Sequence, residues 1–160
     1  MDIVAHTLWA TAAAKAVNRN HPARVSVAWF AAWAAFPDLF SFGPEVVIYL
    51  AYRIAGAAEL HRHHHHFHLY ELSHSLVVFL PVFALVSLLF RRPVWVMLGW
   101  ALHVVMDIPT HSAHFPTPFL WPLSSYTISG VSWRQWSFTL INYSALAFAF
   151  LLLWIRRRRA

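Results

Sequence analysis

The sequence is poor in charged residues and contains no cysteine. Charged side chains make up 11% of its 160 residues, against about a quarter in soluble domains, while 59% are hydrophobic. Together with a mean hydropathy of +0.52, this indicates an integral membrane protein. The absence of cysteine excludes disulfides and thiolate metal ligands, so any metal would be held by nitrogen and oxygen donors. Twelve histidines are available for that purpose.

Two further features bear on targeting and partners. The first residues have an acidic Asp2 and lack a basic region, so we expect no cleavable signal peptide. The formal net charge of +6 comes largely from arginines that flank apolar segments, a pattern typical of membrane topology and not of nucleic-acid binding. We therefore expect membrane lipids as partners and no nucleic acid; the sequence leaves the oligomeric state open.

Apolar segments divide the chain into predicted helices. Five of them, residues 3–17, 23–36, 75–90, 94–108 and 138–155, are predicted to span the membrane. The second is expected to stop at Pro37-Asp38, and the short segment 44–58 is predicted to be interfacial or re-entrant. Residues 109–132 are predicted to form a loop at the membrane face. The expected fold is a single all-α domain over residues 1–160, a polytopic transmembrane helical bundle of about five spans plus one interfacial helix.

Basic residues predict the orientation of this bundle. They gather at Lys15, Arg19 and Arg24, at Arg91-Arg92, and at residues 156–159. The positive-inside rule places all three groups, and therefore the C-terminus, in the cytoplasm. The expected location is a membrane that the chain crosses several times.

The segment LHVVMDIPTH contains the most informative pair of residues. His103 and Asp107 stand four apart in an apolar run, so they lie on one face of a helix and can reach the same metal ion or proton. Ionisable groups inside a bilayer are costly and suggest a functional role. The alternative is a buried hydrogen bond that holds two helices together.

Ionisable residues from other segments are expected at the same depth. With the basic ends of the helices in the cytoplasm, His6, Asp38 and His74 all fall in the outer half of the membrane, close to the level of the central pair. The predicted metal ligands are His6, Asp38, His74, His103, Asp107 and His111. We expect a divalent metal, zinc first, as one ion or two. A polar network that only stabilises the bundle remains the alternative.

The motifs MDIVAH, FPDLF, YELSHSL and LHVVMDIPTHS, followed by FLWPLS, resemble those of the bacterial membrane-bound metal-dependent hydrolases. That family is also described as LexA-binding, inner-membrane-associated hydrolases. The resemblance covers residues 1 to about 125 and implies metal-dependent hydrolysis at the bacterial inner membrane. Many relatives have a His-Arg pair where this sequence has Tyr70 and Glu71, so the role of that pair is lost here or taken over by Glu71 or by the upstream histidines.

Two other stretches have two interpretations each. The histidine-rich tract 61–68 is interpreted as a mobile loop that binds metal loosely, or as a polar loop that becomes cationic when protonated. The aromatic stretch 115–136 suits an interfacial belt. It would also suit a lid over a lipid-facing cleft, with Arg134 or Arg53 recognising phosphate.

These features predict a membrane-embedded hydrolase that cleaves an amphiphilic ester or phosphoester, such as a phospholipid. A metal would activate water, with Asp38, Asp107 or Glu71 as the catalytic base. Two rival functions stay open at this point. One is a metal-binding or metal-transport protein, which would need donors continuing to the cytoplasmic side. The other is a structural or regulatory membrane protein with a polar His/Asp network.

Overall fold

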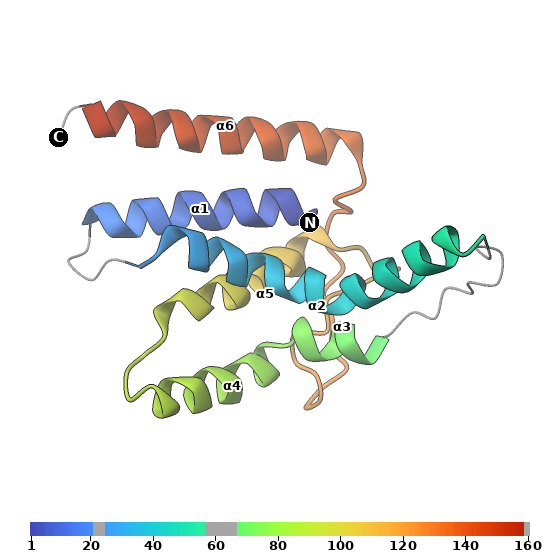
Figure 1. Ribbon diagram of the computed structural model, residues 1–160. Helices are drawn as coiled ribbons and strands as arrows, with labels where there is room; N and C mark the ends of the chain where they lie inside the picture. Colours follow the sequence, from blue (N-terminus) through green and yellow to red (C-terminus); the bar gives the residue numbers. More distant parts are fainter. Residues whose placement is uncertain (21–24, 57–66, 159–160) are drawn as a thin grey trace.

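The computed structural model describes residues 1–20, 25–56 and 67–158, and every regular element within these ranges is helical (Figure 1). In chain order these elements are α1 (Ile3–Asn20), α2 (Val27–Ile54), α3 (Phe67–Ser73), α4 (Leu76–Leu89), the short 3-10 helix η2 (Trp95–Met97), α5 (Leu98–Thr110) and α6 (Trp136–Arg158). The expected all-α class is therefore confirmed for the described part of the chain. The loop expected over residues 109–132 begins at His111, because α5 runs through Pro109 to Thr110; from there to α6 the chain is irregular, as expected.

Helix α2 corrects the expected stop at Pro37-Asp38. The helix runs through both Pro37 and Pro44, so the prediction of a separate interfacial segment over residues 44–58 is wrong. Proline removes a backbone donor and normally kinks or ends a helix. Here other side chains bond to backbone carbonyls near the first proline. Nδ1 of His103 donates to the carbonyl oxygen of Ala34 over 2.7 Å, and the Ser41 hydroxyl donates to that of Pro37 over 2.7 Å.

Two of the helices are long and apolar enough to cross a membrane. They are Val27–Ile54, which is α2, and Trp136–Arg156, which makes up most of α6. Helix α5 has 13 residues, or about 20 Å, against about 30 Å for the hydrocarbon core of a bilayer. The described residues therefore support two spans, and the five expected from the sequence are not confirmed.

Helix α1 contacts both α2 and α6 (Figure 1). Its buried side chains include Ala5, Ala10 and Ala14. Small side chains allow helices to approach closely, which explains the alanine-rich composition of this segment. Near its N-terminal end α1 also contacts α5, the helix that carries the central pair.

A hydrophobic cluster fixes α5 in place. Its buried members are Phe79, Met97, Trp100 and Val104, from α4, η2 and α5. On the α2 side, a side chain at Gly99 would overlap the backbone carbonyl of Phe30, so only glycine fits this close approach. The packing presents one face of α5 to α1, α2 and the turn before α4. Residues 61–66 of the histidine-rich tract lie outside the described residues.

Candidate metal centre

The central pair lies on the buried face of α5. His103 and Asp107 are both buried, and Nε2 of His103 lies 3.1 Å from Oδ2 of Asp107. The spacing of four residues thus places the imidazole and the carboxylate together, as the sequence predicted.

His74 meets this pair from the turn between α3 and α4. Its Nε2 lies 3.1 Å from Nε2 of His103 and 3.6 Å from Oδ2 of Asp107, and its side chain is fully buried. The next residue, Ser75, caps α4 by accepting hydrogen bonds from the backbone N–H groups of Val77 and Val78. The His-Ser pair therefore combines a side chain in the centre with a helix cap that fixes the turn.

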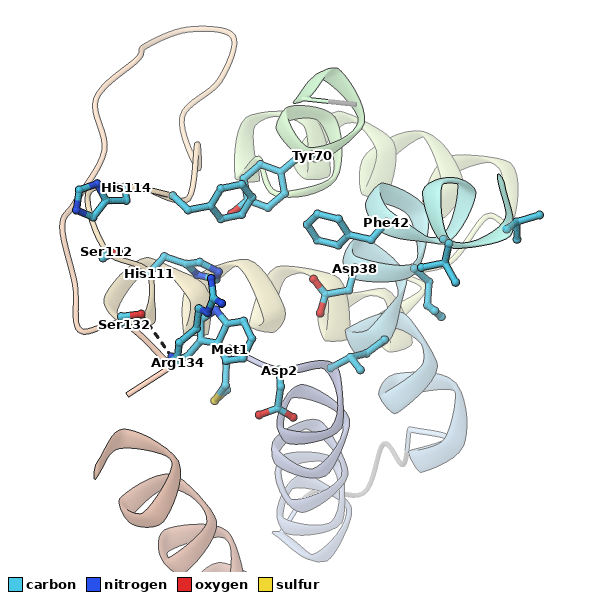
Figure 2. A pocket seen from close by; sticks show the side chains of 17 residues that line it. Met1, Asp2, Asp38, Phe42, Tyr70, His111, Ser112, His114, Ser132 and Arg134 are labelled. Atoms are coloured by element: carbon cyan, nitrogen blue, oxygen red, sulfur yellow. Dashed lines mark hydrogen bonds between the residues drawn. The ribbon is translucent and has the colours of Figure 1, made fainter. Parts of the chain in front are cut away.

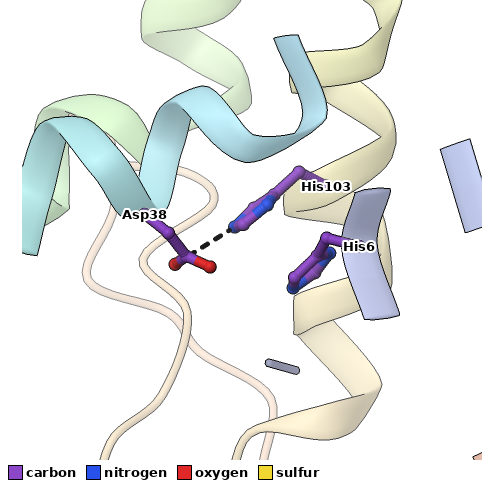
Figure 3. Close-up of side chains that lie close together, drawn as sticks. All are labelled: His6, Asp38 and His103. Carbon is purple, nitrogen blue, oxygen red and sulfur yellow. Dashed lines mark ion pairs between the residues drawn. The ribbon is translucent and has the colours of Figure 1, made fainter. Parts of the chain in front are cut away.

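His6 and Asp38 complete the cluster from α1 and α2. Nε2 of His6 lies 2.9 Å from Oδ1 of Asp107, and the His6 ring stacks on that of His103 with centroids 3.7 Å apart. Asp38 places Oδ1 at 3.5 Å from Nε2 of His74 and 3.7 Å from Nε2 of His103. Figure 3 shows Asp38 reaching from α2 towards His103, with His6 beside the His103 ring. Five predicted site residues are thus brought together.

The hydrogen bonds of the two facing histidines assign their protons. Nδ1 of His103 contacts the carbonyl oxygen of Ala34, which can only accept, so Nδ1 carries the hydrogen. Nδ1 of His74 likewise lies 3.2 Å from the carbonyl oxygen of Tyr70 and 2.9 Å from the Ser73 hydroxyl. In the neutral rings, both Nε2 atoms then carry lone pairs, and these lone pairs face each other across 3.1 Å. The carboxylates of Asp38 and Asp107 add negative charge at the same place.

Such an arrangement of acceptors fits a cation. Two groups of three residues have ligand atoms that all lie within 4.8 Å of one another, namely His6, Asp38 and His103, and His74, His103 and Asp107. In addition, Nδ1 of His6 and Oδ2 of Asp107 are buried without a hydrogen-bond partner in the described part of the chain. The α-amino group of Met1 and the Thr110 hydroxyl also contact Oδ1 of Asp107. These buried histidines and carboxylates could bind a metal ion.

The last two predicted site residues, His111 and Glu71, lie outside both groups of three. Nδ1 of His111 lies 3.0 Å from the backbone carbonyl of Asp107 and 3.4 Å from its Oδ1, at the edge of the cluster and outside both groups of three. Burial is the largest influence on His111 and lowers the pKa of its imidazole below the ordinary value. Glu71 on α3 instead pairs with the exposed His68, with Nδ1 of His68 and Oε2 of Glu71 3.3 Å apart. The structure does not bring Glu71 to the cluster.

A chain of hydroxyl groups behind His74 was not predicted. With every donor satisfied, His74 Nδ1–H donates to Ser73, Ser73 to Ser41 over 2.6 Å, and Ser41 to the Pro37 carbonyl. Trp100 also donates its Nε1–H to the backbone carbonyl of Ser73 over 2.5 Å. These contacts orient His74 in the way that hydrogen bonds behind metal-binding histidines do. Ser41 and Ser73 are 32 residues apart, so no local spacing indicates their pairing.

A pocket of about 890 Å³ opens beside the cluster (Figure 2). Asp38 and His111 line it, and the Asp38 side chain is 17% exposed whereas that of Asp107 is 1% exposed. Much of the remaining wall is apolar and includes Leu39, Phe42 and Val46 of α2. The cluster is therefore closed on the α5 side and accessible from the pocket through Asp38 and His111.

Comparison with known proteins identifies a family. No characterised protein and no solved structure was found to match. A family model described as "YdjM inner membrane protein" matches residues 1–160, the whole chain. This agrees with the apolar composition and with the two helices long enough to span a membrane. The chain therefore belongs to the YdjM inner membrane protein family.

Proposed function

We propose that this inner membrane protein is a metal-dependent hydrolase whose metal is held by His6, Asp38, His74, His103 and Asp107. The observation that carries the proposal is the 3.1 Å separation of the His74 and His103 Nε2 atoms. The Nδ1 hydrogen of His103 is directed to the Ala34 carbonyl, and that of His74 to the Ser73 hydroxyl beside the Tyr70 carbonyl. A bound cation would relieve the repulsion between the two lone pairs and would be attracted by the adjacent carboxylates.

The donor set favours zinc. Imidazole nitrogens and carboxylate oxygens are ordinary zinc ligands, and the chain has no cysteine that would add thiolates. Five donors exceed the four of a tetrahedral site. The two groups of three share His103, so the same side chains would serve one ion with orienting carboxylates, or two ions.

The residues around the site suit hydrolysis. When bound, a divalent metal lowers the pKa of water and polarises a scissile carbonyl or phosphoryl group. Asp107 is enclosed, and its Oδ1 pairs with Nε2 of His6 over 2.9 Å, so it holds the His6 ring in place. Asp38 faces the pocket and is the carboxylate best placed to take a proton from water. Glu71, turned towards His68, is the least suited of the three candidate bases.

The pocket suits an amphiphilic ester or phosphoester. Its apolar wall on α2 would accept a hydrocarbon chain, and its polar end meets the cluster at Asp38 and His111. Such a substrate would reach the site from the lipid of the membrane. Metal transport is less well supported, because the metal-binding groups found among the described residues gather at one place and do not form a path.

Metal content tests the metal site. The measurement uses a parent protein in which His61 and His63 to His66 are serine, so that His68 is the one histidine left in the tract. We expect bound zinc in the parent, loss of that zinc in His103→Ala, and retention in His68→Ala, because the His68 side chain is 92% exposed. A parent that neither carries metal after purification nor takes up added zinc would refute the proposal and leave the polar network as the explanation.

Lipid hydrolysis tests the activity. The zinc-loaded parent is incubated with vesicles of mixed phospholipids, and products are followed by mass spectrometry. We expect products with the parent and none with His103→Ala. With Asp38→Asn we expect the rate to fall by a factor of about 100 or more, since general-base catalysis contributes at least about that factor. A zinc-loaded parent that cleaves no ester or phosphoester in such a screen would contradict the hydrolase assignment.

We further infer a multi-pass topology with a cytoplasmic C-terminus and the site towards the outer face. The C-terminal ends of α1, α4 and α6 lie at one end of the molecule (Figure 1), and the Arg19 guanidinium contacts the backbone carbonyl of Arg156 there. Because the chain has no cysteine, Ser124→Cys and Ala160→Cys each give one labelling position. An impermeant maleimide should label Ser124→Cys in spheroplasts and Ala160→Cys only after permeabilisation; the reverse pattern would invert the topology.

A further inference from the structure

The pocket wall opposite α2 carries an arginine, Arg134. Arg134 lines the pocket, and its guanidinium forms no ion pair with any residue in the described ranges. The two acidic residues that also line the pocket are engaged elsewhere. Asp2 accepts hydrogen bonds from the Ala5 N–H and the Tyr143 hydroxyl, and Asp38 faces His74 and His103. Figure 2 shows Arg134 beside His111 and Met1, across the pocket from Phe42.

The backbone holds Arg134 in this position. The segment before it runs against the end of α5, where the N–H groups of Val131 and Trp133 donate to the carbonyls of Pro109 and Thr110 over 2.9 and 3.0 Å. Gly130 allows this approach, because a side chain there would overlap the Pro109 backbone. Arg134 is therefore carried by a segment tied to the same helix end as the metal centre.

Other donors lie on the same wall. Ser112, His114 and Ser132 line the pocket together with Arg134. An arginine fork with neighbouring hydroxyl and imidazole groups can donate to several oxygens at once. A phosphate group has three such oxygens, whereas a carboxylate has two, so this wall suits phosphate better.

The opposite wall suits a hydrocarbon chain. Leu39, Phe42, Val46 and Val47 line the pocket along α2, a strip that extends about 14 Å from Asp38 at 1.5 Å per residue. Gly43 lies within this strip, and a side chain added there would meet no atom within 4 Å. The pocket thus has an apolar wall along α2 and a polar wall that carries Arg134, and the candidate metal ligands Asp38 and His111 also line it.

We propose that the pocket binds an amphiphile with a phosphate group, and that Arg134 recognises that phosphate and makes the site select phosphoesters over neutral esters. The cleavage of the bound phosphoester rests on the proposed hydrolase function, whereas the binding of its phosphate by Arg134 does not. Arg134 acts as a specificity-determining residue and holds no metal.

Binding of dodecylphosphonate to the chelator-treated full chain tests this proposal apart from metal and catalysis. The protein is kept in non-ionic maltoside micelles and titrated calorimetrically with this non-hydrolysable probe. We expect Arg134→Gln to weaken binding about tenfold, the typical loss for one charge-assisted hydrogen bond. Arg92→Gln, which removes an exposed arginine outside the pocket lining, should bind like the parent. Gly43→Leu should also weaken binding by filling the space for the alkyl chain.

Related probes separate head and tail. Methylphosphonate, dodecanol and dodecanoate should each bind more weakly than dodecylphosphonate, and the Arg134 dependence should be absent with dodecanol. Unchanged dodecylphosphonate affinity in Arg134→Gln, with an unchanged melting temperature, would overturn the proposal. Equal affinity for dodecanoate with the same Arg134 dependence would overturn the choice of phosphate. A failure of zinc binding in the parent would refute the hydrolase and leave this test standing, so the two failures are distinguishable.

Discussion

Helices α5 and α6 show two uses of an apolar helix in one chain. Helix α6 has 23 residues, and side chains such as Leu140, Ile141 and Phe148 are exposed, a surface that a bilayer would cover. Helix α5 has 13 residues and buries three polar side chains, His103, Asp107 and Thr110. Length and hydropathy therefore make α6 a candidate membrane span. Two candidate metal ligands, His103 and Asp107, instead lie on α5, which is too short to meet the same criteria.

The difference arises from what each helix contacts. Helix α5 contacts α1, α2 and α4, and its buried face meets polar groups from several of these neighbours. Helix α6 contacts α1 and leaves most of its surface open. Polar groups in an apolar surrounding need partners, so they are expected on the helix that has neighbours on several sides.

The largest effect is expected from Asp107→Asn on α5. This change keeps the shape and removes the charge that His6 and His103 face across 2.9 and 3.1 Å. Removing one partner of a buried charge pair lowers the free energy of unfolding by about 3–5 kcal/mol. Loss of this carboxylate as a ligand should also abolish zinc binding. We expect no bound metal and a lower melting temperature in detergent, measured with and without chelator. Retention of metal would show that Asp107 is not a ligand and that α5 contributes only His103 to the centre.

Part of this centre could be predicted from local sequence. The spacing of His103 and Asp107 gives one helical face, and the polar residues His6 and His74 stand out next to apolar runs, so their convergence followed from helix lengths and orientation. Their role as metal ligands stays a prediction. The continuity of α2 could not be predicted, because Pro37 is a local helix breaker and the histidine that bonds to the turn before it, His103, comes from another helix.

Tertiary contacts explain the other differences. Glu71 stands three residues before His74, yet α3 turns it towards His68. The pairing of Ser41 with Ser73 and the approach of Gly130 to Pro109 join segments far apart in the sequence. Sequence patterns describe which face of an element is apolar, but they do not specify which two elements meet.

A smaller effect is expected where α5 crosses α2. In Gly99→Ala, the new methyl group would overlap the Phe30 carbonyl, so the helices must separate at a cost of about 1–3 kcal/mol. Gly43→Ala on α2 is the matched control, because its methyl group meets no atom within 4 Å and should be neutral or stabilise by up to about 1 kcal/mol. The measurement is the midpoint of unfolding by heat in detergent. Equal midpoints for the two variants would show that the α2–α5 contact is looser than described.

The smallest effect is expected on α6, from Asn142→Leu. Trp9 of α1 donates its indole N–H to Oδ1 of Asn142 over 2.9 Å, while Nδ2 of Asn142 is buried without a partner in the described ranges. Leucine would leave the indole N–H unpaired but would also remove the unpaired amide, so the two costs partly cancel and a loss of about 1 kcal/mol or less is expected. The midpoint of unfolding and the zinc content are measured together. Zinc content should not change, since Asn142 lies outside the metal-binding groups. A loss of zinc in Asn142→Leu would show that α6 helps to shape the centre, and the division of roles between α5 and α6 would then fail.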